Sequence, residues 1–167
     1  MPAQTDHGTR AADRRAWLTW LVIGWLVAGT CDITYATVFS YLRSGVAPSR
    51  ILQSVASGLI GRVAFDGGAR TAALGLGLHY MNALIITTIF FLVARSQRGL
   101  LQRPVTTGAL YGGVVYLVMN YVVIPLSAIG AIGYPPPAIW ISGVLVHFFL
   151  IGVPIALAAR QAFAQNS

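Results

Sequence analysis

The fold of this chain is decided by the apolar stretch LGLGLHYMNALIITTIFFLV, which runs from Leu74 to Val93. It is long enough to cross a bilayer, yet it carries an imidazole, His79, and a carboxamide, Asn82, near its middle. Because these two residues are three positions apart, they share one face of a helix, with Gly75 about one turn before them. Lipid provides no hydrogen-bond partner, so we expect this face to point at other helices or at a water-filled cavity.

The composition is that of an integral membrane protein. Of the 167 residues, 56% are hydrophobic and 9% are charged, whereas soluble domains carry about 25% charged residues. The isoelectric point near 10.3 raises the question of nucleic-acid binding. However, the arginines are scattered through segments that flank apolar stretches, and no long basic run is interleaved with aromatic residues. We therefore expect no nucleic-acid partner, and we assign the arginines to membrane topology and lipid contact.

Four apolar segments predict an all-α membrane protein, a four-transmembrane-helix bundle in which residues 1–167 form a single integral membrane domain. The first apolar run is longer than the ~7–15 residues of a signal-peptide core, so we expect a retained membrane helix. The polar residues 1–13 are expected to form a disordered tail. The expected spans are approximately residues 16–42, 71–94, 105–129 and 138–159.

The segment between the first two spans is too polar to cross a membrane. Apolar residues recur at helical spacing from Ile51 to Val63, while Gln53 and Ser57 lie on the opposite face. This pattern predicts a short amphipathic interfacial helix within residues 48–65 that lies on the bilayer surface. A re-entrant segment is the alternative, because two glycines in this stretch would allow close packing against other helices.

Small residues and prolines shape the later spans. Gly108 and Gly112 form a GxxxG step that permits close helix approach, and a homo-oligomer through such glycine faces is one expectation. Pro125 predicts a kink in the third span, and Pro154 lies within the fourth. The uncharged, proline-rich connection at residues 130–137 is expected to be a short, stiff turn.

Four spans place both termini on the same side of the membrane. Seven arginines flank the spans on that side and four on the other. Because positively charged loops tend to stay in the cytoplasm, this asymmetry predicts that both termini are cytoplasmic. The seven are Arg10, Arg14, Arg15, Arg95, Arg98, Arg103 and Arg160, and the four are Arg43, Arg50, Arg62 and Arg70.

Polar side chains of all four spans fall at one depth. With a rise of ~1.5 Å per residue, they lie within ~5 Å of the span centres, at the centre or displaced away from the termini. A four-helix bundle would bring the helix faces that carry them together. This polar layer consists of Asp32, His79, Asn82, Asn120 and His147, with Tyr35 and Tyr116 on the same faces.

The polar layer has two main interpretations. Interhelical hydrogen bonds, worth about 1 kcal/mol each, would make the protein a structural or interaction subunit of a membrane complex. Asp32 favours a functional role beyond structural hydrogen bonding, because a lone carboxylate at this depth costs at least ~2.5 kcal/mol and must be neutral or paired. His79 or His147 is the natural partner, and the layer would then line a pocket for a small ligand or a proton pathway.

A metal or haem site is a third interpretation. His79, His147 and Asp32 have the chemistry to ligate zinc or iron, and two facing histidines could hold a b-type haem. Metal motifs usually show tight local spacing, whereas here each ligand comes from a different span, so we expect no cofactor. No serine or threonine lies in a nucleophile elbow, so the sequence predicts no catalytic residue and favours a protein that is not an enzyme.

Several short motifs occur together between residues 75 and 160. They are His79-Tyr-Met-Asn82, Gly108-Ala-Leu at the start of the third span, Pro125-Leu126, Pro135-Pro136, and Ser142 five residues before His147. In this combination the chain resembles a group of small bacterial inner-membrane proteins, the YagU-like hypothetical membrane proteins. The resemblance implies a four-helix bundle in the bacterial inner (plasma) membrane, and it implies no activity.

Overall fold

The computed structural model describes residues 5–130, 133 and 136–164. Within these residues, four helices are long and apolar enough to cross a membrane, so the protein is a multi-pass helical membrane protein. They correspond to the four predicted spans and confirm the predicted helical bundle. Their membrane-crossing parts are Arg14–Ser44, Gly68–Ser96, Pro104–Leu126 and Pro137–Ala164.

The first two spans are single helices, and the last two are composite. The first span is α1 (Thr5–Ser44) and the second is α3 (Gly68–Ser96). The third span consists of α4 (Pro104–Val118), the π-helical turn η3 (Met119–Val123) and the short α5 (Ile124–Leu126). The fourth consists of α6 (Pro137–Val146), the π-helical turn η4 (His147–Gly152) and α7 (Val153–Ala164). The 3-10 turn η2 (Arg98–Leu101) connects the second span to the third.

Two segments were expected to be irregular, the tail at residues 1–13 and the connection at residues 130–137. Helix α1 begins at Thr5, so residues 5–13, expected to belong to a disordered tail, continue the first helix. Residues 1–4 lie outside the described part of the chain, and so do residues 131, 132, 134 and 135 of the proline-rich connection at residues 130–137.

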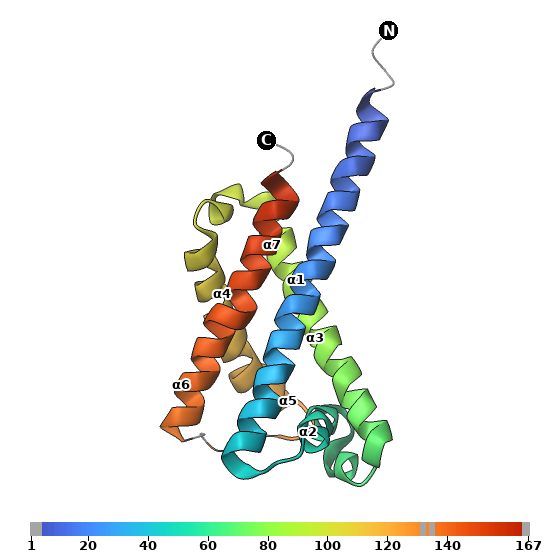
Figure 1. The fold of residues 1–167 in the computed structure, drawn as a ribbon, viewed down its shortest axis with the longest axis vertical. Coiled ribbons are helices and arrows are strands. Elements are labelled where there is room, and N and C mark those ends of the chain that lie inside the picture. Colours follow the sequence, from blue (N-terminus) through green and yellow to red (C-terminus); the bar gives the residue numbers. More distant parts are fainter. Residues whose placement is uncertain (1–4, 131–132, 134–135, 165–167) are drawn as a thin grey trace.

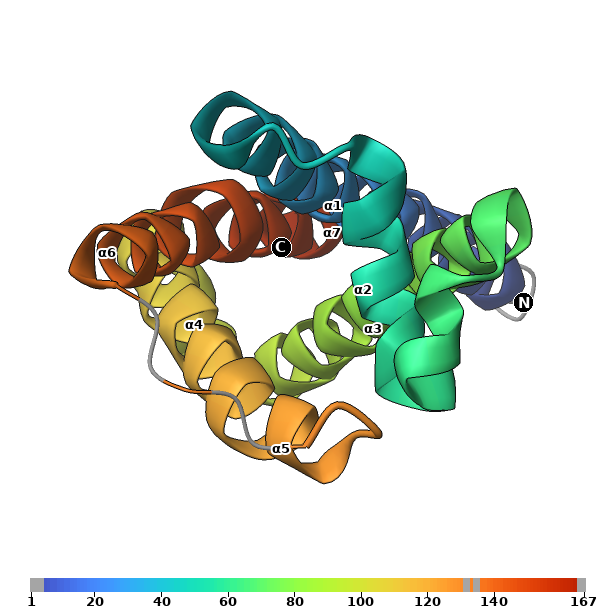
Figure 2. The ribbon, with the colours of Figure 1, turned by 90° about the horizontal axis from the view of Figure 1, so that it is seen from below.

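In Figure 1 both termini of the chain lie at one end of the bundle, which we call the terminal end. Helix α2 (Pro48–Ile60) lies across the opposite end, which we call the α2 end. Helix α7 packs between α1 and α4, and α3 packs against α1 and α7. Helices α3 and α4 meet towards the terminal end, where the rings of Phe90 and Tyr111 are 4.9 Å apart. Viewed from the α2 end, the second and third spans diverge (Figure 2), so the bundle is wider at that end.

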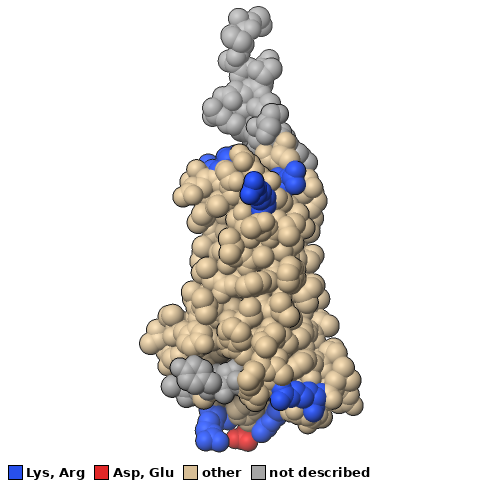
Figure 3. All heavy atoms as spheres, turned by 90° about the vertical axis from the view of Figure 1, so that its left-hand side faces the viewer, with Lys and Arg blue, Asp and Glu red and all other residues tan. Residues whose placement is uncertain are grey.

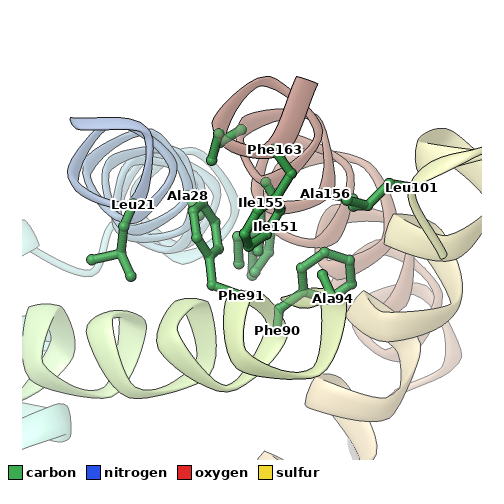
Figure 4. Close-up of a cluster of buried hydrophobic side chains, with 13 residues drawn as sticks. Leu21, Ala28, Phe90, Phe91, Ala94, Leu101, Ile151, Ile155, Ala156 and Phe163 are labelled. Atoms are coloured by element: carbon green, nitrogen blue, oxygen red, sulfur yellow. The ribbon is translucent and has the colours of Figure 1, made fainter. Parts of the chain in front are cut away.

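The terminal half of the bundle has a closed hydrophobic core. Phe91 and Ile155 have no exposed surface, and Phe90 is 2% exposed. Figure 4 shows the ring of Phe91 on α3 beside Ile151 and Ile155 of the fourth span. Leu21 of α1 belongs to the same cluster. Three of the four spans therefore form a tight apolar plug on this side of the molecule.

Glycines allow the spans to approach each other closely. A Cβ added at Gly108 would lie 2.6 Å from the carbonyl oxygen of Gly152, and one added at Gly112 would overlap the carbonyl oxygen of His147. Gly24 of α1 faces Ala158 of α7 in the same way. The glycine faces that the sequence offered to a homo-oligomer are therefore occupied by helices of the same chain.

Helix α2 continues into the 3-10 turn η1 (Gly61–Phe65) and is tied to the start of α3. Its polar residues Gln53 and Ser57 are buried, whereas the apolar Leu59 and Val63 are more than 60% exposed, at 61% and 64%. Gln53 Nε2 donates a hydrogen bond to the carbonyl oxygen of Gly68 over 3.0 Å. The predicted helix is present, but its Gln53 side chain contacts the start of α3 instead of water, because the first turn of α3 provides a backbone acceptor.

Charged side chains gather at the two ends of the molecule. On the face shown in Figure 3, Arg side chains lie at the terminal end and at the α2 end, with a belt free of charged residues between them. A bilayer requires this distribution, since its hydrocarbon core excludes charge while its headgroup regions attract arginine.

Replacing Gly112 by alanine tests the close contact between the third and fourth spans. The added Cβ would meet the backbone of His147 and Phe148, which cannot move aside as a flexible side chain can. We expect Gly112→Ala to lower the free energy of unfolding by about 1–3 kcal/mol, measured from helical circular dichroism on heating in detergent. Gly77→Ala is the matched control, because its added Cβ would have nothing within 4 Å beyond the local backbone of its own helix and its two chain neighbours. Equal melting temperatures for the two variants would contradict the packing argument.

Candidate functional site

A cavity of about 290 Å³ lies between the spans. The five non-tyrosine residues of the predicted polar layer all line this cavity. Each of these side chains is half-buried, so each is shielded from the surroundings without being sealed into the core. They come from all four spans: Asp32 from α1, His79 and Asn82 from α3, Asn120 from η3, and His147 from η4.

Two of the five residues lie in π-helical turns. Asn120 belongs to η3, and His147 begins η4. Each turn ends two residues before a proline, Pro125 or Pro154. Proline has no N–H for the carbonyl four residues earlier, and its ring clashes with that carbonyl, so a regular α-helix cannot continue through it. The wider turns accommodate the prolines, and such turns occur frequently at functional sites.

Both histidines donate a ring N–H to a backbone carbonyl. His79 Nε2 lies 2.8 Å from the carbonyl oxygen of Gly29 on α1, and His147 Nδ1 lies 2.9 Å from that of Gly143 one turn earlier. A carbonyl oxygen can only accept, so these ring nitrogens carry the protons. In the neutral rings, Nδ1 of His79 and Nε2 of His147 are then hydrogen-bond acceptors.

The remaining polar groups of the cavity also present acceptors. Asn120 Nδ2 donates to the carbonyl oxygen of Tyr116 over 2.9 Å, which leaves Oδ1 as the free acceptor of that amide. Within the described residues, Asp32 and Asn82 make no side-chain hydrogen bond and no ion pair with another part of the protein. The expected pairing of Asp32 with a histidine is not formed among the described residues, and the one ring nitrogen of each histidine that makes a hydrogen bond contacts a backbone carbonyl oxygen.

The two tyrosines assigned to the polar layer do not line the cavity. Tyr116 is buried and packs edge-on against His147, with ring centroids 5.1 Å apart. Tyr35 stacks on Phe39 within α1 at a centroid distance of 5.2 Å. Tyr116 therefore holds a cavity residue in place from behind, whereas Tyr35 belongs to the surface of its own helix.

The hydrogen bonds that join the spans come mostly from residues that the sequence analysis did not single out. Trp25 Nε1 of α1 donates to the carbonyl oxygen of Tyr80 on α3 over 2.7 Å, and the hydroxyl groups of Thr30 and Tyr80 are 2.8 Å apart. The Tyr111 hydroxyl donates from α4 to the carbonyl oxygen of Ile86 on α3 over 2.6 Å. These amphipathic aromatic residues lie inside spans instead of at their ends, and this position is the sequence signal that could have identified them.

The polar groups of the cavity are not arranged around a metal ion. Among the described residues, no group of three or more His, Cys, Asp and Glu side chains is placed to hold a metal. Asp32, His79 and His147 line one cavity without forming such a group.

The cavity adjoins a larger groove of about 730 Å³ on the side of α2. Both spaces have Asn82, Met119 and Ile124 in their walls, together with Ser54 and Val55 of α2. In the opposite direction, the cavity ends at Ile86 and Ile151, beside the apolar plug of the terminal half. The polar layer is therefore approached from the α2 end and closed towards the terminal end.

Removing the Tyr111 hydroxyl tests which groups hold the spans together. We expect Tyr111→Phe to destabilise the folded protein by about 1 kcal/mol, because Ile86 loses an interhelical donor. Asn82→Leu is the comparison, and we expect it to leave the melting temperature in detergent nearly unchanged, because Asn82 has no described protein partner to lose. A larger loss of stability in Asn82→Leu than in Tyr111→Phe would indicate that the polar layer is structural.

No protein-family model, curated protein or solved structure matches this chain. The resemblance to the YagU-like proteins therefore stays a prediction from short motifs. The shape of the cavity and the hydrogen bonding of its walls are the observations on which a function must rest.

Proposed function

We propose that this protein binds a small cation rich in hydrogen-bond donors, such as a protonated amine, in the intramembrane cavity around Asp32. The observation that carries the proposal is the direction of the hydrogen bonds. His79, His147 and Asn120 each donate a hydrogen bond to a backbone carbonyl. The second ring nitrogen of each neutral histidine and Oδ1 of Asn120 are left as free acceptors. Together with the carboxylate of Asp32, the cavity wall offers an excess of acceptors, which a donor-rich ligand complements.

Charge supports a cationic ligand over a neutral one. Asp32 is the only Asp, Glu, Lys or Arg side chain in the cavity wall, and no described cation pairs with it. An ionised carboxylate inside a membrane is costly unless a positive charge accompanies it. A bound ammonium group would supply that charge, and it would donate hydrogen bonds to the carboxylate and to the free ring nitrogens.

The closed terminal half supports a binding pocket in preference to an open pathway. Phe91 and Ile155 are fully buried and, with Ile151, block the route from the cavity to the terminal end. An ion or proton following a continuous path would need polar groups or water through this layer, which the plug does not offer. A ligand would therefore enter and leave on the α2 side in this conformation.

The structural-subunit interpretation has less support from the same contacts. A purely structural polar layer would form hydrogen bonds between spans. However, Asn120 and His147 form hydrogen bonds within their own spans, and Asn82 has no described partner. Only His79 of the polar layer makes an interhelical hydrogen bond, to Gly29. The Trp25, Tyr80 and Tyr111 contacts already perform the joining role.

We further propose that both termini lie in the cytoplasm and that the membrane is the bacterial inner membrane. The excess of arginines on the terminal side, seven against four, supports the orientation through the positive-inside rule. The motif resemblance to the YagU-like proteins supports the location. With this orientation the cavity would open away from the cytoplasm and would take its ligand from that side.

Binding of methylammonium tests the proposal directly. We expect methylammonium chloride, compared with sodium chloride at equal ionic strength, to raise the melting temperature of the detergent-purified protein, with stabilisation of about 1.4 kcal/mol at ten times the dissociation constant. Asp32→Asn removes the counter-charge, and we expect it to abolish this shift. Asp66→Asn is the matched control, because Asp66 follows η1 outside the cavity. The same shift in Asp32→Asn as in the unchanged protein would rule out the carboxylate as the binding group.

Cysteine labelling tests access to the cavity from one side. In a Cys31→Ser background, we expect Asp32→Cys in sealed vesicles to react with a cationic, membrane-impermeant methanethiosulfonate reagent added on the α2 side, and not on the terminal side. Thr87→Cys is the control, because Thr87 has no exposed surface and should stay unlabelled from both sides. Reaction of Asp32→Cys from the terminal side would show that the plug opens.

A further inference from the structure

The groove beside the polar cavity opens between two membrane-spanning segments. One wall consists of α2, η1 and α3, and the other consists of η3, α5 and the residues that follow them. Leu59 is 61% exposed and Met81 is 49% exposed along its walls, so the groove is open at its side. At about 730 Å³ it lies within the usual range of ligand sites, roughly 300–1,000 Å³. A side opening at this position in the bundle faces lipid chains.

The lining of the groove changes along its length. At the α2 end it contains Arg62 and Ser127, beyond the last turn of the third span. Towards the centre of the bundle it contains apolar side chains as far as Met119 and Asn82, about 10 Å deeper along the third span at the rise of a helix. A charged rim followed by an apolar channel matches the order of a lipid molecule, with its headgroup at the interface and its chain directed inward.

Arg62 sets the charge of the headgroup that would fit. It is exposed, and among the described residues it makes no ion pair and no hydrogen bond through its guanidinium group. It is also the only charged residue in the lining, so no carboxylate there could hold the ammonium group of a zwitterionic lipid. Its neighbour Arg50 is engaged differently, because it donates to the carbonyl oxygen of Phe65 over 3.0 Å and lies over the phenyl ring.

We propose that the groove binds one anionic phospholipid of the leaflet at the α2 end. Its phosphate contacts Arg62 through charge-assisted hydrogen bonds, and one acyl chain runs between α3 and η3 to the neighbourhood of Asn82. The lipid chain covers the side of the polar cavity, because Asn82 and Met119 separate the two spaces. This site does not depend on the cation proposed for the cavity, since Asp32 and both histidines lie outside the groove lining.

Native mass spectrometry of the detergent-purified protein tests this site with two lipids of identical chains, phosphatidylglycerol and phosphatidylcholine. We expect a one-to-one complex that forms preferentially with phosphatidylglycerol. Arg62→Gln should weaken that complex about five-fold, the contribution of one arginine to an anionic surface, and should leave binding of phosphatidylcholine unchanged. Arg62 is exposed, so this variant should keep its fold. Arg70→Gln is the matched control, because Arg70 is also exposed at the start of α3 but does not line the groove.

A second variant tests the channel for the chain. Gly58 lines the groove, and a Cβ added there would lie 3.8 Å from Ser127, in ordinary contact, so Gly58→Leu should place its side chain in the open space. We expect it to lose both lipids while keeping its melting temperature, whereas Gly77→Leu, outside the groove, should keep both. Three outcomes would overturn the proposal. The unchanged protein could bind both lipids with equal affinity, Arg62→Gln and Arg70→Gln could have equal effects, or a folded Gly58→Leu could bind lipid fully. A loss of methylammonium binding in Asp32→Asn with unchanged lipid binding would separate the two sites.

Discussion

The bilayer interior offers no hydrogen-bond partner, so every polar group in the four spans must be satisfied by the chain itself or by something bound within it. Several side-chain donors of the spans follow that constraint, whereas Trp17 Nε1, near the start of the first span, is buried without a hydrogen-bond partner among the described residues. The N–H groups of His79, His147, Asn120 and Trp25 all find backbone carbonyls. The acceptors do not, because backbone N–H groups inside helices are already used and few donors remain. An excess of acceptors around one carboxylate is the result, and it gives the cavity its chemical character.

The bundle is tight at one end and open at the other for reasons that can be traced to particular residues. At the terminal end, small residues such as Gly24 and Ala158 bring helices together around large apolar side chains. Towards the α2 end, Pro125 and Pro154 interrupt the third and fourth spans and widen them into π-helical turns. The π-helical turns before these prolines carry Asn120 and His147, which line the cavity. The side groove lies where the third span diverges from α3.

The position of α2 connects the cavity and the groove to the end of the membrane. Its buried polar side bonds to the start of α3, and the amide of Ala128 donates to the carbonyl oxygen of Gly58 over 2.9 Å. This second contact links α2 to the chain that follows the third span. Without it, the groove would have only one wall at the headgroup level. A helix that the sequence pattern assigned to the membrane surface therefore completes the boundary of an internal site.

The sequence by itself determined the four spans, because apolar runs of this length have no other stable environment. Helical rise also predicted one polar layer, and its five non-tyrosine residues line one cavity: Asp32, His79, Asn82, Asn120 and His147. The sequence also predicted a kink at Pro125. Only the tertiary structure decided which partner each polar group finds. The role of Tyr111 and the burial of Gln53 depend on which carbonyl of a neighbouring helix lies within reach. Helix rotation and packing angle set those distances, and neither is encoded in the spacing of residues along one span.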